Sequence, residues 1–105
     1  MSGGDWKEML VAVQEGNLAL VQYHIKNGVD PNYEHPELMT TPLIESVEYR
    51  QIEIAKYLLE HGADPMQCAW LSKDNPLSIA KRNGQKDFIR LLKAHRPKRF
   101  GRFWW

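Results

Sequence analysis

The sequence predicts an all-α fold, a solenoid of three stacked helix-turn-helix units with protruding finger loops. Two observations predict it: the chain repeats itself with a period of 34 residues, and apolar residues recur at helical spacing within each unit. Pairs that match at this offset include Gly28 with Gly62, Asp30 with Asp64, Pro31 with Pro65, Pro42 with Pro76, and Leu43 with Leu77. Such a unit cannot bury its apolar side alone, so it stacks on its neighbour.

Each unit is expected to contain a shorter inner helix followed by a longer outer helix. The apolar residues of the inner helices are Met9, Leu10, Ala12 and Val13, then Leu43, Ile44 and Val47, then Leu77, Ile79 and Ala80. Those of the outer helices are Leu20, Val21 and Ile25, then Ile54, Ala55, Leu58 and Leu59, then Phe88, Ile89, Leu91 and Leu92. The two rows would face each other within a unit and continue into the next one.

Start and stop signals bound these helices. Pro42 and Pro76 suit the first helical position, where a missing N–H costs nothing, and Thr41 and Asn75 precede them as N-caps. A glycine follows the apolar row of each of the first two outer helices and can end it in the left-handed conformation. The Asp-Pro pair after each glycine then turns the chain away.

Length and composition bound the class of protein. The 105 residues suffice for one compact domain, and 14 Lys and Arg against 13 Asp and Glu argue against nucleic-acid binding by overall basic charge. The single Cys68 cannot form an internal disulfide, and no Cys/His cluster suits zinc, so burial must stabilise the fold, as in a reducing cytoplasm. No apolar run is long enough to span a membrane, and no signal peptide is evident.

Two segments resemble the ankyrin repeat: TPLIESV from Thr41 and EIAKYLLEHGADP from Glu53. The resemblance covers roughly residues 5–93 and implies an L-shaped stack of antiparallel helix pairs with fingers at about 32–40 and 66–74. We expect a single domain over 1–97 and a basic aromatic tail over 98–105. The expected repeats are about 5–37, 38–71 and 72–96.

Two departures from the family pattern are expected to weaken the fold. Ile44 and Ser78 replace the His of the family's TPLH motif, so the hydrogen bonds with which that side chain steadies the turn should be absent. Arg50 occupies the slot held by Gly16 and Gly84, and a left-handed backbone there costs about 1 to 2 kcal/mol relative to glycine.

The resemblance implies a binding scaffold that contacts partners through finger tips and the exposed side of the inner helices. Carried onto this sequence, those positions are Gln14, Glu15, Glu37, Leu38, Thr40, Glu45, Glu48, Tyr49, Trp70, Leu71, Ser72, Asp74, Arg82 and Asn83. Trp70, Leu71 and Tyr49 are the candidate anchors for a partner's pocket. The alternative for Trp70 is that it folds down over the neighbouring finger.

Charge divides unevenly along the chain. Residues 1–80 hold five Lys or Arg against twelve Asp or Glu, whereas residues 81–105 hold nine against one. Glu15, Glu37, Glu45 and Glu48 should gather on the groove side of the first two repeats and favour a basic protein partner. Such a groove would suit an immunity protein that inhibits a basic nuclease or another cationic effector. A solvated acidic face without a partner is the alternative.

The tail does not belong to any repeat. Besides Lys98, its basic and aromatic residues are the candidate contacts Arg99, Phe100, Arg102, Phe103, Trp104 and Trp105. Three roles remain open: binding single-stranded nucleic acid, binding an anionic membrane, or folding back to cover an apolar flank of the last repeat. We favour the third role. Recognition of the tail by another protein and weak self-association through Trp104 and Trp105 are further alternatives to a monomer.

No enzymatic site is expected, and no metal or cofactor. The four histidines are scattered, and phosphate loops, HExxH and GxSxG motifs are missing. Cys68 would need a base such as His35, with no third group to orient that base, so a small, partly buried thiol is the favoured interpretation.

Overall fold

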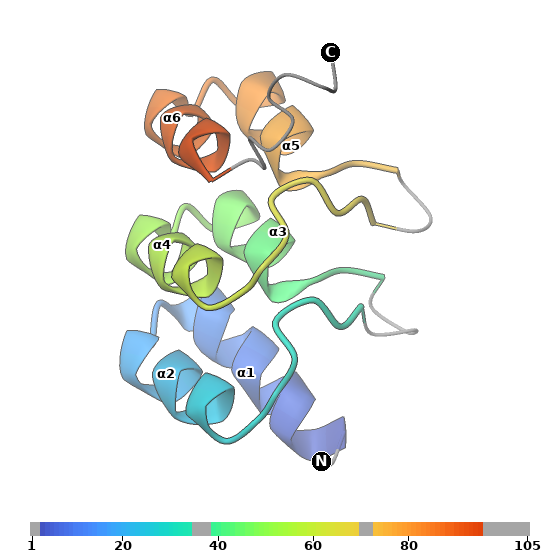
Figure 1. Cartoon of the computed structure of the whole chain (residues 1–105), viewed down its shortest axis with the longest axis vertical. Coiled ribbons are helices and arrows are strands. Elements are labelled where there is room, and N and C mark those ends of the chain that lie inside the picture. The colour runs from blue at the N-terminus through green and yellow to red at the C-terminus, as the bar shows by residue number, and fades with distance from the viewer. Residues whose placement is uncertain (1–2, 35–38, 70–72, 96–105) are drawn as a thin grey trace, which may run out of the picture.

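The computed structural model describes residues 3–34, 39–69 and 73–95. The helices of these residues form three antiparallel pairs. They are α1 (Gly3–Glu15) and α2 (Leu18–Lys26), α3 (Pro42–Glu48) and α4 (Ile52–Glu60), and α5 (Pro76–Arg82) and α6 (Lys86–Ala94). Figure 1 shows the pairs stacked in a row, with loops projecting to one side. The predicted all-α solenoid of three units is therefore confirmed, whereas the end of the domain at residue 97 stays a prediction.

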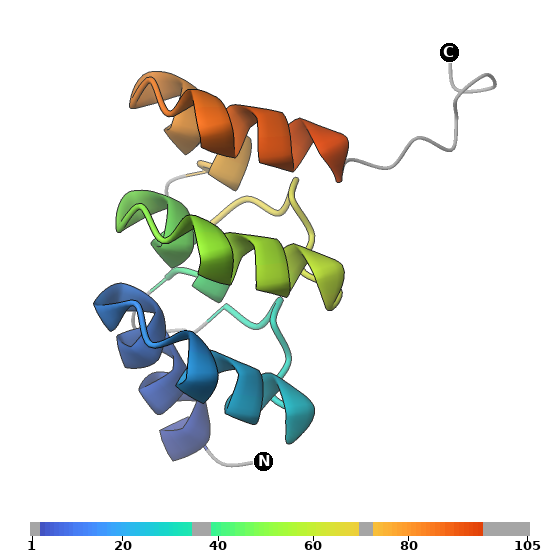
Figure 2. The same ribbon diagram turned by 90° about the vertical axis from the view of Figure 1, so that its left-hand side faces the viewer.

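Outer helices α2, α4 and α6 lie side by side and run in the same direction (Figure 2). In the last two pairs the outer helix is longer than the inner one, as expected, but α1 has 13 residues and α2 only nine. The reason is the missing proline: Glu8 stands where Pro42 and Pro76 begin α3 and α5, so α1 extends further toward the N-terminus. That extension carries Trp6, which is buried against Val29.

The predicted caps are present. The Thr41 hydroxyl accepts a hydrogen bond from the Ile44 N–H at 3.3 Å, and Asn75 Oδ1 accepts one from the Ser78 N–H at 2.7 Å. Ser78 Oγ in turn accepts from the Asn75 N–H at 3.0 Å, which completes a capping box. Ser78 thus makes a different side-chain hydrogen bond in place of those expected of the family's His, because its short hydroxyl reaches the N-cap. Ile44 instead joins the core.

One apolar core runs through all three layers. Val13, Val47 and Leu58 are fully buried, and Leu77 and Leu92 continue the same cluster in the last pair. Each repeat therefore covers an apolar side of the next, as the pattern of the sequence predicted.

Three equivalent turns join the inner and outer helices. Gly16, Arg50 and Gly84 have φ angles of 78°, 57° and 67°. The left-handed backbone expected at Arg50 is thus observed, and the cost of about 1 kcal/mol relative to glycine applies there.

The outer flank of the third repeat is polar. Val47 and Leu59 are buried in the second repeat, but their equivalents 34 positions later are Lys81 and Lys93, which are exposed. No large apolar side chain of residues 73–95 is exposed. The expected apolar flank is therefore wrong, because charged side chains replace apolar ones at the end of the stack.

Candidate partner-binding surface

The last turns of the inner helices carry candidate partner-binding residues at equivalent positions. One row across the stack is Gln14, Glu48 and Arg82, and the next is Glu15, Tyr49 and Asn83. All of them are exposed except Gln14, which is half-buried. Because the inner helices lie in one layer (Figure 1), the structure brings these predicted residues together on one face.

Glu45 is held in place by the first repeat and by its own loop. Its Oε1 accepts a hydrogen bond from Gln14 Nε2 at 2.8 Å, and its Oε2 accepts one from the Thr40 hydroxyl at 3.1 Å. The side chain is half-buried. Glu45 therefore joins two repeats and adds negative charge to the face, but both oxygens already have internal partners.

Asp74 and Arg82, two further predicted contacts, form an ion pair. Arg82 Nη1 lies 3.3 Å from Asp74 Oδ1, and both side chains are partly exposed. An exposed pair of this kind adds little stability. The acidic part of the inner-helix face is therefore formed by Glu15 and Glu48, which have no ion-pair partner in the described part of the chain.

Asn32 connects the bases of the two fingers. Its Nδ2 donates to the Gly62 carbonyl at 2.9 Å, and its Oδ1 accepts from the Asp64 N–H at 2.7 Å. Gln67 Nε2 donates to the Asn32 carbonyl at 2.9 Å. These bonds couple the first finger to the second, so both project from a common base.

Both fingers return to the stack through a left-handed residue. Met39 and Lys73 occupy equivalent positions and have φ angles of 54° and 64°. In the second finger the Ala69 N–H donates to the Asp74 carbonyl, and the Lys73 N–H to the Ala69 carbonyl, both at 2.8 Å. Between these bonded positions the predicted anchors Trp70 and Leu71 lie outside the described residues, as do Ser72, Glu37, Leu38 and the tail residues Arg99 to Trp105.

Val11 and Tyr33 are exposed apolar side chains that the sequence analysis did not predict. Val11 of α1 is 48% exposed. It aligns with Glu45 at the offset of 34, and this polar equivalent could have indicated from the sequence that Val11 lies on the surface. Tyr33 at the first finger is 45% exposed and meets Trp6 edge to face, with ring centroids 5.0 Å apart. Tyr49, which was predicted, is half exposed.

Among the described residues, no His, Cys, Asp and Glu side chains gather in threes to hold a metal ion. Cys68 is exposed, not partly buried as expected, and His35 falls outside the described part. His24 is buried, with Nε2 2.9 Å from Glu8 Oε1, and so belongs to the packing of the first repeat. No described helix is both long and apolar enough to cross a membrane.

Comparison with known proteins identifies the fold family. The family described as ankyrin repeats in three copies matches residues 9–101. Palmitoyltransferase AKR1 of Lachancea kluyveri is 40% identical over 65 residues, which cover 62% of this chain and 8% of that protein. Human 2-5A-dependent ribonuclease is 32% identical over 81 residues, which cover 77% of this chain and 9% of that protein. The matched segment is thus less than a tenth of either relative.

A solved structure agrees. The ankyrin domain of AnkB from Legionella pneumophila superposes with a TM-score of 0.70 and 26% identity, covering 87% of this chain and 86% of that chain. Ankyrin repeats are in general non-enzymatic modules for protein–protein interaction. With its period of 34 residues, its three stacked helix pairs and this match over most of its length, the chain belongs to the ankyrin repeat family.

Proposed function

We propose that the chain binds a basic protein through the inner-helix face of its first two repeats and the adjoining fingers. The observation that carries this proposal is the pair of exposed carboxylates of Glu15 and Glu48 on one face, neither of which has an ion-pair partner among residues 3–34, 39–69 and 73–95. The oriented carboxylate of Glu45 lies on α3 beside them. Like charges gathered on one face steer an oppositely charged partner and set its orientation.

Affinity would come from apolar contacts next to these charges. Tyr49 and Val11 are half exposed on the inner helices, and Trp70 and Leu71 are the proposed anchors in the second finger. Aromatic anchors surrounded by polar residues are typical of the centre of a protein interface.

The partner we propose is a cationic effector, such as a nuclease, met in the cytoplasm. A nuclease binds nucleic acid through cationic side chains. An acidic face on this chain could bind those side chains and so block the nuclease's nucleic-acid-binding surface. In that role the chain is an inhibitor or immunity protein, which acts by occupying the effector's binding surface.

Charge reversal tests the proposal. In affinity capture followed by titration of the captured protein, Glu15→Lys with Glu48→Lys should weaken binding at least about tenfold, with a larger loss at low salt. The matched control is Glu53→Lys with Glu60→Lys, which makes the same change of charge on the exposed side of α4. Equal losses in both variants, or no loss in the first, would exclude the acidic face as the binding site.

The second candidate is an adaptor for nucleic acid or an anionic membrane, led by the tail. It is favoured by the exposed cations of the third repeat, which are Lys81, Arg82, Lys86, Arg90 and Lys93. Binding of single-stranded DNA or phosphatidylserine vesicles that disappears at high salt and on deletion of residues 98–105 would select it.

A further inference from the structure

The first repeat exposes apolar side chains at positions that the third repeat buries. Val11 is 48% exposed, whereas its equivalent Ile79 is 2% exposed. Leu20 is half-buried, whereas its equivalent Phe88 is 4% exposed. Both positions are covered in the third repeat because the second repeat lies against it. No helix of the described residues lies against the corresponding side of the first repeat (Figure 1).

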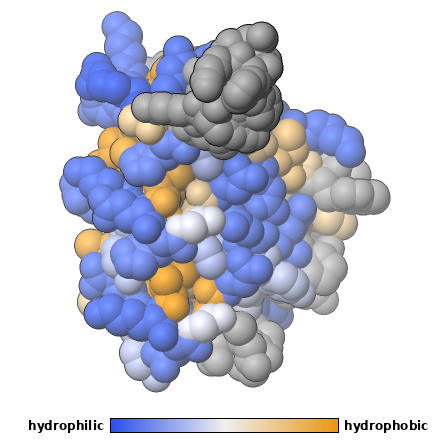
Figure 3. Space-filling model, viewed as in Figure 1, coloured by the Kyte–Doolittle hydropathy of each residue, from blue (hydrophilic) through white to orange (hydrophobic). Residues whose placement is uncertain are grey.

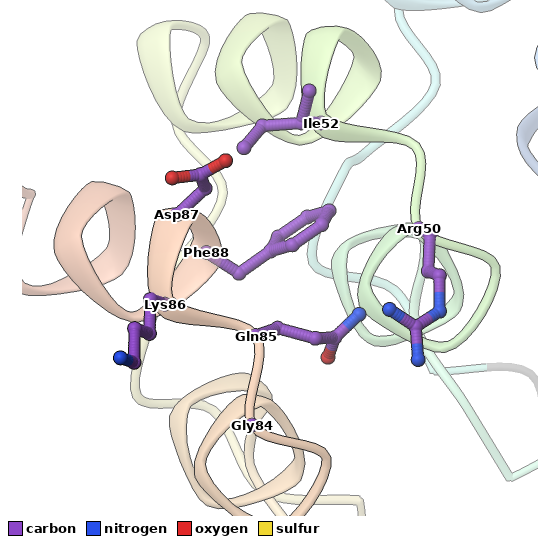
Figure 4. Close-up of a pocket in the computed structure, with 7 residues that line it drawn as sticks. All are labelled: Arg50, Ile52, Gly84, Gln85, Lys86, Asp87 and Phe88. Atoms are coloured by element: carbon purple, nitrogen blue, oxygen red, sulfur yellow. The ribbon is translucent and has the colours of Figure 1, made fainter.

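The third repeat also shows which side chains of an outer helix face the preceding repeat. Phe88 points from α6 toward the second repeat, at an open space of about 400 Å³ (Figure 4). Leu91 lines a second space between α4 and α6, and Figure 3 shows apolar surface between the hydrophilic layers of the stack. At the offset of 34 these residues correspond to Leu20 and Tyr23. Leu20 and Tyr23 therefore face the outward side of the first repeat, where Tyr23 is 59% exposed.

Val11, Leu20 and Tyr23 form one patch, which we call the first-repeat flank. The distance of 2.9 Å from Glu8 Oε1 to His24 Nε2 fixes the register of α1 against α2. Val11 follows Glu8 by three residues and Leu20 precedes His24 by four, so the two lie at the same level of this antiparallel pair. The rings of Tyr23 and His24 meet edge to face, with centroids 5.3 Å apart. The flank thus continues from α1 across to α2.

Charged side chains border this patch at its two ends. Lys7 and Glu15 lie four residues before and after Val11, on the same side of α1. Lys26 is equivalent to Ala94, which lines the space between α4 and α6. All three charged side chains are exposed. Because α1 and α2 are antiparallel, Lys7 and Lys26 lie at one end of the flank and Glu15 at the other.

The first-repeat flank lacks the features that join one repeat of this chain to another. In the third repeat, Gln85 Nε2 donates to the Val47 carbonyl of the preceding repeat at 3.0 Å. The equivalent Asn17 instead accepts a hydrogen bond from the Leu20 N–H at 3.2 Å and so caps its own helix. The outer flank of the third repeat carries exposed lysines, which would be a poor cover for apolar side chains. Copies of this chain are therefore not expected to stack end to end.

We propose that the first-repeat flank binds an amphipathic helix of a partner protein, parallel to α1. The apolar stripe of that helix packs on the patch, as helices of neighbouring repeats pack on one another. Its acidic first turn lies over Lys7 and Lys26, and its basic last turn lies over Glu15. Acids at the start and cations at the end also suit the dipole of the helix itself. A length of about 20 Å matches α1, which has 13 residues.

This surface extends the proposed function without resting on it. The first-repeat flank adjoins the acidic face at Val11 and Glu15, whereas Glu48 belongs to the second repeat and to the acidic face alone. Glu48→Lys should therefore weaken capture of a basic protein but leave binding of the helix unchanged. The two proposals can fail separately.

A synthetic peptide tests the inference on the full chain. It has about 18 residues, with Glu in the first turn, Leu at helical spacing, Lys in the last turn and Ala elsewhere. In an NMR titration its dissociation constant should be about 100 µM, with the largest shifts at Val11, Leu20 and Tyr23. Val11→Lys should weaken binding at least about tenfold. The matched control is Met66→Lys, which makes the same change of charge at a side chain that is 38% exposed outside the flank.

A nitroxide on the first residue of the peptide tests the direction of the helix. It should broaden the amide signals of Lys7 and Lys26 more than that of Glu15. Glu15→Lys with Lys26→Glu conserves the net charge and should move the broadening toward residue 15. A pattern that does not respond to this exchange would show that the charges do not orient the helix.

Other outcomes would overturn the inference. Absence of shifts at the patch with about 1 mM peptide would show that the flank does not take a helix. Binding that survives Val11→Lys, in a variant with an unchanged helical circular dichroism spectrum, would place the peptide elsewhere. Shifts of the same residues on concentrating the chain alone would make a second copy the occupant.

Discussion

The two junctions between repeats use the same positions but differ in one residue. At the first, the amide of Gln51 lies against Gly16 and is 3.5 Å from the Gln14 carbonyl, whereas at the second, Arg50 takes the place of the glycine, Gln85 donates to the Val47 carbonyl at 3.0 Å, and an open space of about 400 Å³ lies beside them. Arg50 also holds a left-handed backbone at a cost that glycine does not have. The same glutamine position thus joins neighbouring repeats through a different carbonyl at each junction.

The largest effect on stability is expected at the closed junction. Gly16→Ala places a Cβ at a φ of 78° and within 3.0 Å of the Gln51 amide, so we expect a loss of about 2 kcal/mol in the free energy of unfolding. Gly84→Ala is the control, since its Cβ meets nothing within 4 Å, and it should lose only about 1 kcal/mol. Urea denaturation measures both, and equal losses would show that the Gln51 contact adds no stability.

The glutamine bridges come next. Gln85→Ala removes a buried 3.0 Å hydrogen bond and leaves the Val47 carbonyl without that donor, so a loss of about 1.5 kcal/mol is expected. Gln51→Ala removes a longer, less buried contact of 3.5 Å and should lose about 0.5 kcal/mol. If Gln51→Ala lowered the urea midpoint more than Gln85→Ala did, the hydrogen bond of Gln85 to Val47 would not stabilise the second junction as proposed.

A gain in stability is expected when the left-handed Arg50 is replaced by glycine. Arg50→Gly removes a non-glycine residue with a φ of 57° and should raise the free energy of unfolding by about 1 kcal/mol. For a domain of this size that corresponds to a rise of about 4 to 8 °C in Tm. Calorimetry would contradict the strain argument if Tm stayed the same or fell.

The smallest change in stability is expected at the polar flank. Lys81→Val with Lys93→Leu restores the residue types of the second repeat, and the free energy of unfolding should change by less than about 0.5 kcal/mol. The variant should nevertheless self-associate, since it exposes the apolar side that normally meets a further repeat. Sedimentation velocity detects this. A chain that remains as monomeric as the control Lys26→Leu would show that the two lysines do not end the stack.

Much of the fold could be predicted because its determinants are local. The proline at the start of an inner helix, the cap before it and the glycine after an outer helix each act within a few residues, and the period of 34 repeats them. The rows of apolar residues then dictate which sides of the helices meet. Exposure of Tyr49 and the left-handed backbone of Arg50 followed from the same alignment of repeats.

Only the tertiary structure decided how side chains from different repeats pair. The bond of Gln14 to Glu45, the ion pair of Asp74 with Arg82 and the bond of Gln85 to the Val47 carbonyl depend on where flexible side chains meet in the stack. Sequence spacing says that two helices are neighbours, but not which rotamers bring a donor within 3 Å of an acceptor. The stack was therefore determined by the sequence pattern, and the partners available at its surface by packing in three dimensions.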